Sequence, residues 1–218
     1  MFVVTADQID SRHDRDRASE MITALVSRYE PEFALPPDQT SGDEIQLLVP
    51  QASAALAVVL DLHRTGYWSI GVGVGGVRTP LPARTRQATG GAFIAARAAV
   101  TRSKRADARF ALDHAPSALP AEPGPDESAQ PTGADVEALL TMLLLLRQKR
   151  TTEGWEVVDL LESGLAQTAI ARALGISPAA VSQRVKSSQW KVERAARPAL
   201  VRLLDNLDRS TSETESIE

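Results

Sequence analysis

The sequence contains no cysteine, and this absence removes several kinds of chemistry at once. Without cysteine the chain cannot form disulfide bonds, cysteine-ligated metal sites or thiol nucleophiles. Histidine is nearly as scarce. The three histidines, His13, His63 and His114, are widely separated, and none has the spacing of a metal ligand or a catalytic base. We therefore expect all three to lie on the surface, outside any active site.

Long hydrophobic runs are also missing. No apolar stretch approaches the ~20 residues that cross a bilayer. The first ten residues, MFVVTADQID, lack the basic segment and apolar core of a signal peptide. We expect a cytoplasmic protein with no membrane partner. The 218 residues, of which 43% are hydrophobic, suit one large or two small globular domains.

A stretch without apolar periodicity divides the chain. Residues 115–134, APSALPAEPGPDESAQPTGA, are rich in proline, glycine, serine and alanine, which is typical of a flexible linker. We predict an α+β domain over 1–114, a linker over 115–135, an all-α helix-turn-helix domain over 136–209, and a disordered acidic tail over 210–218.

The net charge of −4 hides an uneven distribution. Residues 1–114 hold thirteen basic and thirteen acidic side chains, whereas the linker and the tail hold acids only. Residues 136–209 hold eleven basic and eight acidic side chains. The basic excess therefore lies in the helical domain, where a nucleic-acid partner would need it.

The most specific pattern in the chain is Gln167–Trp190, QTAIARALGISPAAVSQRVKSSQW. Gly175 is the residue type that most easily takes the left-handed conformation at a helix end. Ser177 is a good N-cap, and Pro178 suits the first position of a second helix because its missing N–H costs nothing there. The segment therefore predicts two helices joined by a tight turn, the helix-turn-helix that enters the DNA major groove.

The second predicted helix has one core-facing side and one outward side. Val181 and Val185, four residues apart, would face the core. Gln183 and Arg184 have side chains that pair with adenine and guanine edges, and Lys191 would bind phosphate. The predicted DNA-binding residues are Ser177, Ala179, Ala180, Ser182, Gln183, Arg184, Lys186 and Ser187.

An ordinary helical hairpin is the alternative interpretation of this segment. Against it, the segment resembles the helix-turn-helix of MarR-like regulators and of region 4 of sigma factors. The resemblance covers only this stretch and implies binding to double-stranded DNA.

The first domain alternates between β-rich and helical patterns. Strands are predicted at Phe2–Ala6, Phe33–Thr40, Glu44–Val49, Trp68–Val74 and Arg109–Leu112, and helices at Asp16–Tyr29, Ala52–Arg64 and Gly91–Arg105. The order is that of a ferredoxin-like fold, β-α-β-β-α-β, with one further helix and strand. The glycines within WSIGVGV indicate that another backbone approaches this strand closely.

Two acidic turns are notable in that arrangement. Asp7 ends the first strand and Asp43 lies in the hairpin between the next two, so both carboxylates are expected at one end of the sheet. Two nearby carboxylates repel unless a cation lies between them, and Mg²⁺ is often held by one or two carboxylates plus substrate phosphates. Arg12 could clamp a phosphate, and Gly90–Gly91 before a helix offers N–H groups to an anion. The combination points to a nucleotide bound with Mg²⁺ or Mn²⁺.

The segments Phe2–Arg12 and Thr40–Leu48 resemble the palm domain of class III nucleotidyl cyclases and of diguanylate cyclase (GGDEF) domains. The resemblance implies a metal site formed by Asp7, Asp43 and the backbone carbonyl of Gln8. The first 114 residues also resemble the SatD-type family of bacterial proteins, including members with an appended helix-turn-helix. The candidate nucleotide-binding residues are Arg12, Gly42, Glu44, Gly90 and Gly91.

The cyclase machinery has no complete counterpart in this chain. A base-recognising pair and a transition-state arginine and asparagine cannot be placed, and Ser41-Gly42 stands where diguanylate cyclases carry two glycines. We therefore name no catalytic residue. The purely structural alternative is that Asp7 ends a strand, Asp43 is a turn residue and Glu44 is solvated.

Together these patterns favour a DNA-binding transcriptional regulator whose first domain senses a nucleotide or dimerises. The segment Val136–Arg150 is apolar around more than one face, so it is expected to contact a second subunit or the first domain. One alternative is a metal-dependent nucleotidyl cyclase or nucleotidyltransferase-like enzyme tethered to DNA. Another is a scaffold with a degenerate palm domain.

Overall fold

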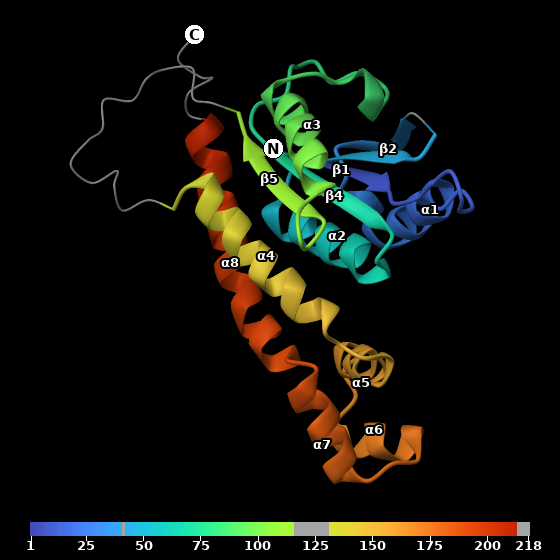
Figure 1. The fold of residues 1–218 in the computed structure, drawn as a ribbon. Coiled ribbons are helices and arrows are strands. Elements are labelled where there is room, and N and C mark those ends of the chain that lie inside the picture. Colours follow the sequence, from blue (N-terminus) through green and yellow to red (C-terminus); the bar gives the residue numbers. More distant parts are fainter. Residues whose placement is uncertain (41, 116–130, 213–218) are drawn as a thin grey trace, which may run out of the picture. The chain divides into compact units, whose positions relative to one another are not determined.

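Five strands form one mixed sheet in the N-terminal part of the chain (Figure 1). The computed structural model describes residues 1–40, 42–115 and 131–212. The strands are β1 (Phe2–Gln8), β2 (Leu35–Thr40), β3 (Glu44–Val49), β4 (Trp68–Val74) and β5 (Phe110–His114). Their order in the sheet is β2-β3-β1-β4-β5, and all neighbouring pairs are antiparallel except β4 and β5.

The helices of this part follow the predicted order. They are α1 (Ala18–Tyr29), α2 (Ala52–Thr65) and α3 (Gly91–Ser103), with short 3-10 turns η1 (Glu30–Glu32) and η2 (Thr85–Gln87). α3 lies on one side of the sheet, whereas α1 and α2 lie on the other (Figure 1). The prediction that helices and strands mix in the N-terminal domain is confirmed.

Two glycines let α3 lie directly on β4. A Cβ atom added to Gly71 would lie 2.2 Å from the backbone nitrogen of Val100. One added to Gly73 would lie 2.1 Å from the carbonyl oxygen of Ala92. The buried positions of α3 are mostly alanine, so small residues meet on both sides of this contact. The predicted close approach of another backbone to this strand is therefore confirmed.

His63 is buried, which contradicts the prediction that all three histidines lie on the surface. It is 8% exposed, whereas His13 and His114 are exposed. His63 follows the buried residues Leu56 and Val59 of α2 at intervals that place the three on one helix face. This apolar face carries the imidazole into the core.

Two compact units are defined by the contacts within the chain. The first comprises residues 1–141 with the segment from 200 onward, and the second comprises residues 142–199. Helices α4 (Gly133–Gln148) and α8 (Trp190–Ser212) have residues in both units. The division between the units falls inside these two helices.

The helical segment extends beyond the predicted domain boundaries of 136 and 209 at both ends. α4 begins early because Thr132 Oγ1 accepts a hydrogen bond from the Asp135 N–H, while the Asp135 carboxylate accepts one from the Thr132 N–H. α8 extends to Ser212, so the first residues of the predicted tail are helical. Residues 116–130 of the predicted linker and 213–218 of the tail lie outside the described ranges.

Glu137 connects the first part of α4 to the sheet within the first unit. Its Oε2 accepts hydrogen bonds from Arg102 Nη2 at 2.9 Å and from the backbone N–H of Leu112 at 2.6 Å. Val136 and Leu140, on either side of Glu137, are buried. These contacts explain why the beginning of α4 belongs to the unit that contains the sheet.

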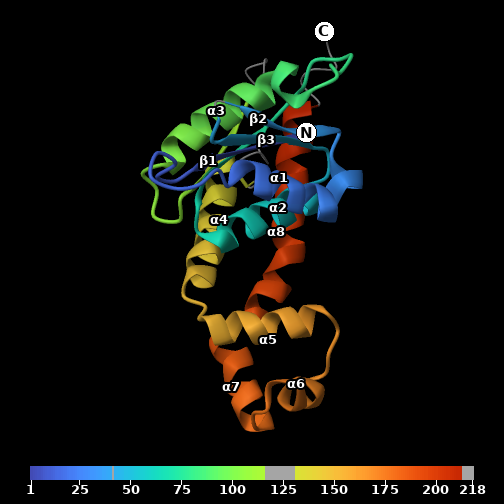
Figure 2. The same cartoon turned by 90° about the vertical axis from the view of Figure 1, so that its right-hand side faces the viewer.

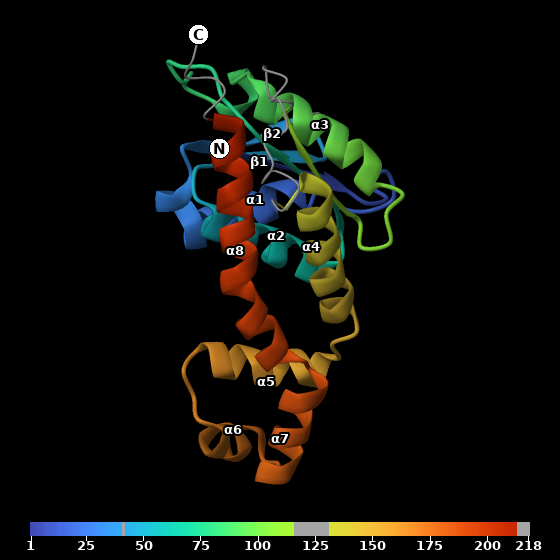
Figure 3. The same cartoon turned by 90° about the vertical axis from the view of Figure 1, so that its left-hand side faces the viewer.

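Three helices build the core of the second unit (Figure 2 and Figure 3). They are α5 (Thr152–Glu162), α6 (Gln167–Leu174) and α7 (Pro178–Ser187). The core contains Val157, Val158, Ile170, Ala171, Val181 and Val185 of these helices, together with Trp190 at the start of α8. Across the described residues, no helix is both long and apolar enough to cross a membrane.

Buried charges accompany this core in the second unit. Glu193 forms ion pairs with Arg147, Arg150 and Arg197. The Arg147 and Arg150 guanidiniums lie 4.8 and 4.2 Å from the ring centre of Trp155. Burial lowers the pKa of Arg147 to about 10, because the loss of hydration outweighs the attraction of Glu193. Several charged side chains therefore lie where α4, α5 and α8 meet.

Candidate nucleic-acid interface

The turn between α6 and α7 has the geometry that the sequence predicts. Gly175 takes the left-handed conformation, with φ of 64°, and ends α6. Ser177 precedes α7, and its Oγ accepts a hydrogen bond from the N–H of Ala180 at 3.1 Å. Pro178 is the first residue of α7. These features produce a short, capped connection between the two helices.

The outward side of α7 is polar and accessible. Val181 and Val185 are buried in the core of the unit, as their spacing predicts. None of the eight predicted DNA-binding residues is buried. The exposed ones are Ser177, Ala179, Ser182, Gln183, Lys186 and Ser187, and the half-buried ones are Ala180 and Arg184. The surface therefore begins with small side chains, which allow close approach, and continues with side chains that can donate hydrogen bonds.

Arg184 differs from the other predicted contacts because it already has an anionic partner. Its Nη1 lies 3.0 Å from Oε2 of Glu156 on α5, and its side chain is 29% exposed. To contact DNA, Arg184 would exchange this carboxylate for a phosphate or a guanine edge. This pair is not predictable from residue spacing, because Glu156 lies 28 residues away along the chain.

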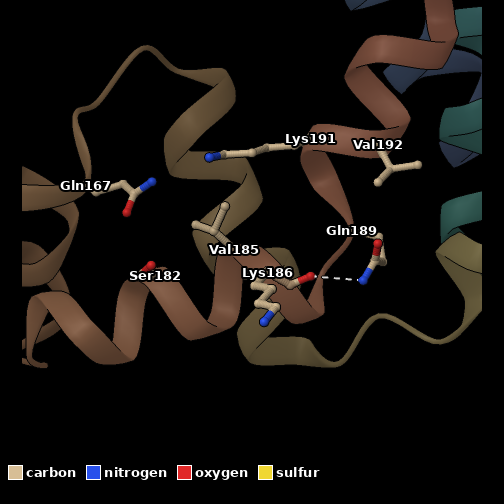
Figure 4. A pocket seen from close by; sticks show the side chains of 7 residues that line it. All are labelled: Gln167, Ser182, Val185, Lys186, Gln189, Lys191 and Val192. Atoms are coloured by element: carbon tan, nitrogen blue, oxygen red, sulfur yellow. Dashed lines mark hydrogen bonds between the residues drawn. The ribbon is translucent and has the colours of Figure 1, made fainter.

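A cleft of about 380 Å³ lies beside α7, bounded by the first residues of α6 and α8 (Figure 4). Its polar lining comes from Gln167, Ser182, Lys186, Gln189 and Lys191. Gln189 Nε2 donates a hydrogen bond to the carbonyl oxygen of Lys186 at 3.1 Å. Gln167 was not among the predicted contacts. Its position at the start of the first helix was the available signal, because that helix crosses the DNA backbone in helix-turn-helix complexes.

Within the helix-turn-helix segment itself, every charged side chain is basic. The thirty residues from 163 to 192 contain no aspartate or glutamate and four basic side chains, Arg172, Arg184, Lys186 and Lys191. The second unit as a whole holds nine basic and five acidic side chains. A positive surface on α6 and α7 is what attraction to a phosphate backbone requires.

In the predicted metal site of the first unit, the carboxylate of Asp7 already has a basic partner. Asp7 is the cross-strand partner of Glu44 in the β1–β3 pair. Its Oδ2 lies 2.7 Å from Nζ of Lys104, just after α3. The ammonium group therefore lies against the carboxylate that was expected to bind a cation.

Asp43 also has protein partners. Its Oδ2 accepts a hydrogen bond from the Ser11 hydroxyl at 2.6 Å, and its carbonyl oxygen accepts one from the Gln8 N–H at 3.0 Å. The described residues contain no group of three or more histidine, aspartate or glutamate side chains that could hold a metal ion. Two carboxylates, one of them paired with Lys104, do not by themselves form a metal centre. We therefore assign no chemistry to a metal, and the Mg²⁺ or Mn²⁺ site stays a prediction.

The predicted nucleotide-binding residues separate into two groups. Arg12 lies exposed in the connection after β1, and Gly42 occupies the β2–β3 turn with φ of 83°. The other three line one groove of about 750 Å³ on the α3 side of the sheet. Those three are Glu44, Gly90 and Gly91. Glu44 is only 7% exposed, so the interpretation of Glu44 as a solvated residue is wrong.

Three arginines that sequence reasoning did not select also line this groove. They are Arg78 and Arg86 in the connection between β4 and α3, and Arg97 in α3. We call this feature the arginine groove. No motif links the three positions, and only the path of the connection brings them together.

Comparison with known protein families, with curated proteins and with solved structures finds no match to this chain.

Proposed function

We propose that this protein is a DNA-binding transcriptional regulator, with α6 and α7 as its helix-turn-helix and α7 as the helix that enters the major groove. The observation that carries the proposal is the capped turn from Gly175 to Pro178, followed by a helix with two buried valines and an outward polar face. A tight turn and an accessible second helix are the two requirements of this motif.

The roles of individual side chains follow from their chemistry. Gln183 is exposed and has an amide that can pair with adenine through two hydrogen bonds. Lys186 and Lys191 provide positive charge beside the cleft at the start of α6, which suits phosphate contacts. The absence of acidic residues between 163 and 192 supports the same assignment.

For the first unit we propose a ferredoxin-like arrangement similar to the palm of nucleotidyl cyclases. The order of the first four strands and the antiparallel pairing of β1 with both β3 and β4 support this assignment. We propose that this unit senses a nucleotide, and that the protein acts as a dimer. Leu139 and Met142, three residues apart on α4, are large apolar side chains left exposed, which supports a partner on that helix.

The experiment that tests the proposal is selection of binding sites from a random library of double-stranded DNA by the full chain. Affinity for the selected site is then measured by fluorescence anisotropy over a range of salt concentrations. We expect a selected consensus and a strong decrease in affinity with salt. Gln183→Ala should reduce discrimination at one base pair by about 1–3 kcal/mol.

Lys186→Ala should weaken binding to all sequences and lower the salt dependence by about one counterion. Lys149→Ala is the matched control, because Lys149 is exposed in the same unit but lies outside α6 and α7. A selection that yields no consensus, together with equal effects of the two lysine variants, would rule out the helix-turn-helix assignment.

A further inference from the structure

We infer that the arginine groove of the first unit binds a nucleotide, through its phosphate at Arg78 and Arg97 and through hydrogen-bond donors of the sugar or base at Glu44. This inference deepens the proposed regulatory function, because it locates the ligand of the sensing unit. It does not depend on a metal ion or on the Asp7 and Asp43 turns.

The groove is built from three parts of the fold. Its floor is formed by Glu44 and Gln46, which are two residues apart on β3 and therefore share one face of the sheet. One wall is α3, with Ile94 and Arg97. The other wall is the connection between β4 and α3, which contributes Arg78. The three parts line an open groove of about 750 Å³, within the range of small-molecule sites.

The connection that forms the second wall is fixed to its surroundings. The Arg78 N–H donates to the carbonyl oxygen of Thr89 at 2.9 Å, which closes the connection on itself. Thr85 Oγ1 donates to the carbonyl oxygen of Pro36 at 2.7 Å, which attaches η2 to β2. The wall therefore holds its shape through contacts within the protein.

The arginines of the groove are not equivalent. Arg86 is paired with Asp38, with 3.4 Å between Nε and Oδ2. Arg78 and Arg97 are both exposed, and neither forms an ion pair within the part of the chain that the structure describes. Gly90 precedes α3 without a side-chain cap, so the N-terminus of this helix adds further positive potential to the same hollow. Two guanidiniums and a helix end on one hollow favour a phosphate group over a neutral ligand.

The floor distinguishes a nucleotide from a simple anion. The Glu44 carboxylate is held by the Thr40 hydroxyl, with 2.6 Å between Oγ1 and Oε1. A carboxylate repels free phosphate, but it accepts hydrogen bonds from ribose hydroxyls or base amino groups. Gln46 beside it can both donate and accept. The groove thus offers separate places for a phosphate and for a neutral donor group, which a nucleotide combines.

The rim adds an apolar surface. Ile94 is 75% exposed, which is unusual for a large aliphatic side chain in an otherwise well-packed domain. It lines the groove one helical turn before Arg97. A base that packs on Ile94 would cover this side chain while its phosphate reaches Arg97. The groove therefore matches the amphipathic character of a nucleoside monophosphate or diphosphate.

The test is isothermal titration calorimetry of the full chain with AMP, GMP, ADP, GDP and inorganic diphosphate. We expect at least one nucleotide to bind with a dissociation constant below about 1 mM, and inorganic diphosphate to bind more weakly. The double variant Arg78→Ala/Arg97→Ala should weaken nucleotide binding at least about tenfold. Arg84→Ala is the matched control, because Arg84 is an exposed arginine of the same connection that does not line the groove.

Several outcomes would overturn the inference. It fails if no nucleotide binds, if Arg84→Ala weakens binding as much as the double variant, or if inorganic diphosphate binds as tightly as any nucleotide. Displacement of the nucleotide by a short oligonucleotide, at equal concentration, would instead make the groove a nucleic-acid surface. Circular dichroism establishes that each variant is folded.

DNA binding of the same preparations separates this inference from the proposed function. Nucleotide binding without any DNA binding would contradict the helix-turn-helix proposal and leave the groove assignment intact. DNA binding without any nucleotide binding would contradict the groove assignment and leave the helix-turn-helix proposal intact.

Discussion

The carboxylate of Glu193 lies 2.7 Å from the guanidinium of Arg150, and both side chains are almost completely buried. Arg147, also buried, pairs with the other carboxylate oxygen, and Arg197 approaches from the more exposed side. Arg150 further donates from Nε to the carbonyl oxygen of Ser188, just before α8. A single carboxylate therefore pairs with three arginines in the second unit.

Glu193→Gln should destabilise the protein strongly. The substitution keeps the size of the side chain but leaves two buried guanidiniums without an anion, and breaking a buried pair in this way costs about 3–5 kcal/mol. Arg197→Ala is the comparison, because the Arg197 side chain is 39% exposed, and its loss should cost less than about 1 kcal/mol. Urea unfolding followed by circular dichroism measures both. Equal, small losses in the two variants would show that the buried pairs contribute little.

The same carboxylate should make stability depend on acid pH. Burial alone would raise the pKa of Glu193, but the attraction of Arg147 and the hydrogen bonds from Arg197 and Arg150 outweigh it, and the pKa is lowered from its ordinary value of 4.5. The stabilisation by Glu193 is therefore complete above pH 4.5 and is lost as the pH falls through the folded-state pKa. The free-energy difference between wild type and Glu193→Gln, measured from pH 7 to pH 3, should shrink in the acid range. A difference that stays constant down to pH 3 would contradict this prediction.

Gly71→Ala and Gly73→Ala should each destabilise the first unit. The new Cβ atoms would lie 2.2 Å and 2.1 Å from backbone atoms of α3, a distance that no side-chain rotation can relieve. Forcing the helix away from the strand should cost about 1–3 kcal/mol or more. Thr101→Ala, on the exposed side of the same helix, should change stability by less than about 0.5 kcal/mol. Thermal and urea unfolding provide the measurement, and normal stability of both glycine variants would show that α3 can shift freely.

Glu156→Gln should strengthen DNA binding at low salt. The substitution weakens the ion pair that holds Arg184 and removes a negative charge near the proposed interface. Because such a half-exposed pair contributes roughly 0.2–1 kcal/mol, affinity should rise by about 1.4-fold to fivefold. Asp159→Asn, a matched change of an exposed acid on the same helix, should have a smaller effect. Anisotropy with the selected DNA site tests this, and an unchanged or weaker affinity for Glu156→Gln would argue against a role of Arg184 at the interface.

Local signals explain which parts of the structure were predictable. The turn from Gly175 to Pro178 was predictable because each residue acts on the backbone within a few positions of itself. Gly71 and Gly73 indicated a close approach because a glycine inside a strand has few other reasons to be there. Predictions of this type depend on one residue and its immediate neighbours.

Long-range pairs explain what was missed. Lys104 contacts Asp7 across 97 residues, and Arg147 contacts Glu193 across 46. No spacing rule relates such positions, because their contact depends on how helices pack in three dimensions. Thr132, which lies within the predicted linker, caps α4 and moves its start toward the N-terminus. The arginines of the groove were missed for the same reason, although three other lining residues, Glu44, Gly90 and Gly91, are predicted to bind a nucleotide.

The contact of α3 with β4 also affects the entropy of ligand binding. Because backbone meets backbone at Gly71 and Gly73, the helix wall of the groove is already fixed against the sheet before a ligand binds. A ligand would immobilise only the side chains that reach it, at about 0.5–1.5 kcal/mol for each long side chain. Two small residues in a strand would thus lower the entropic cost of filling a groove that the helix lines.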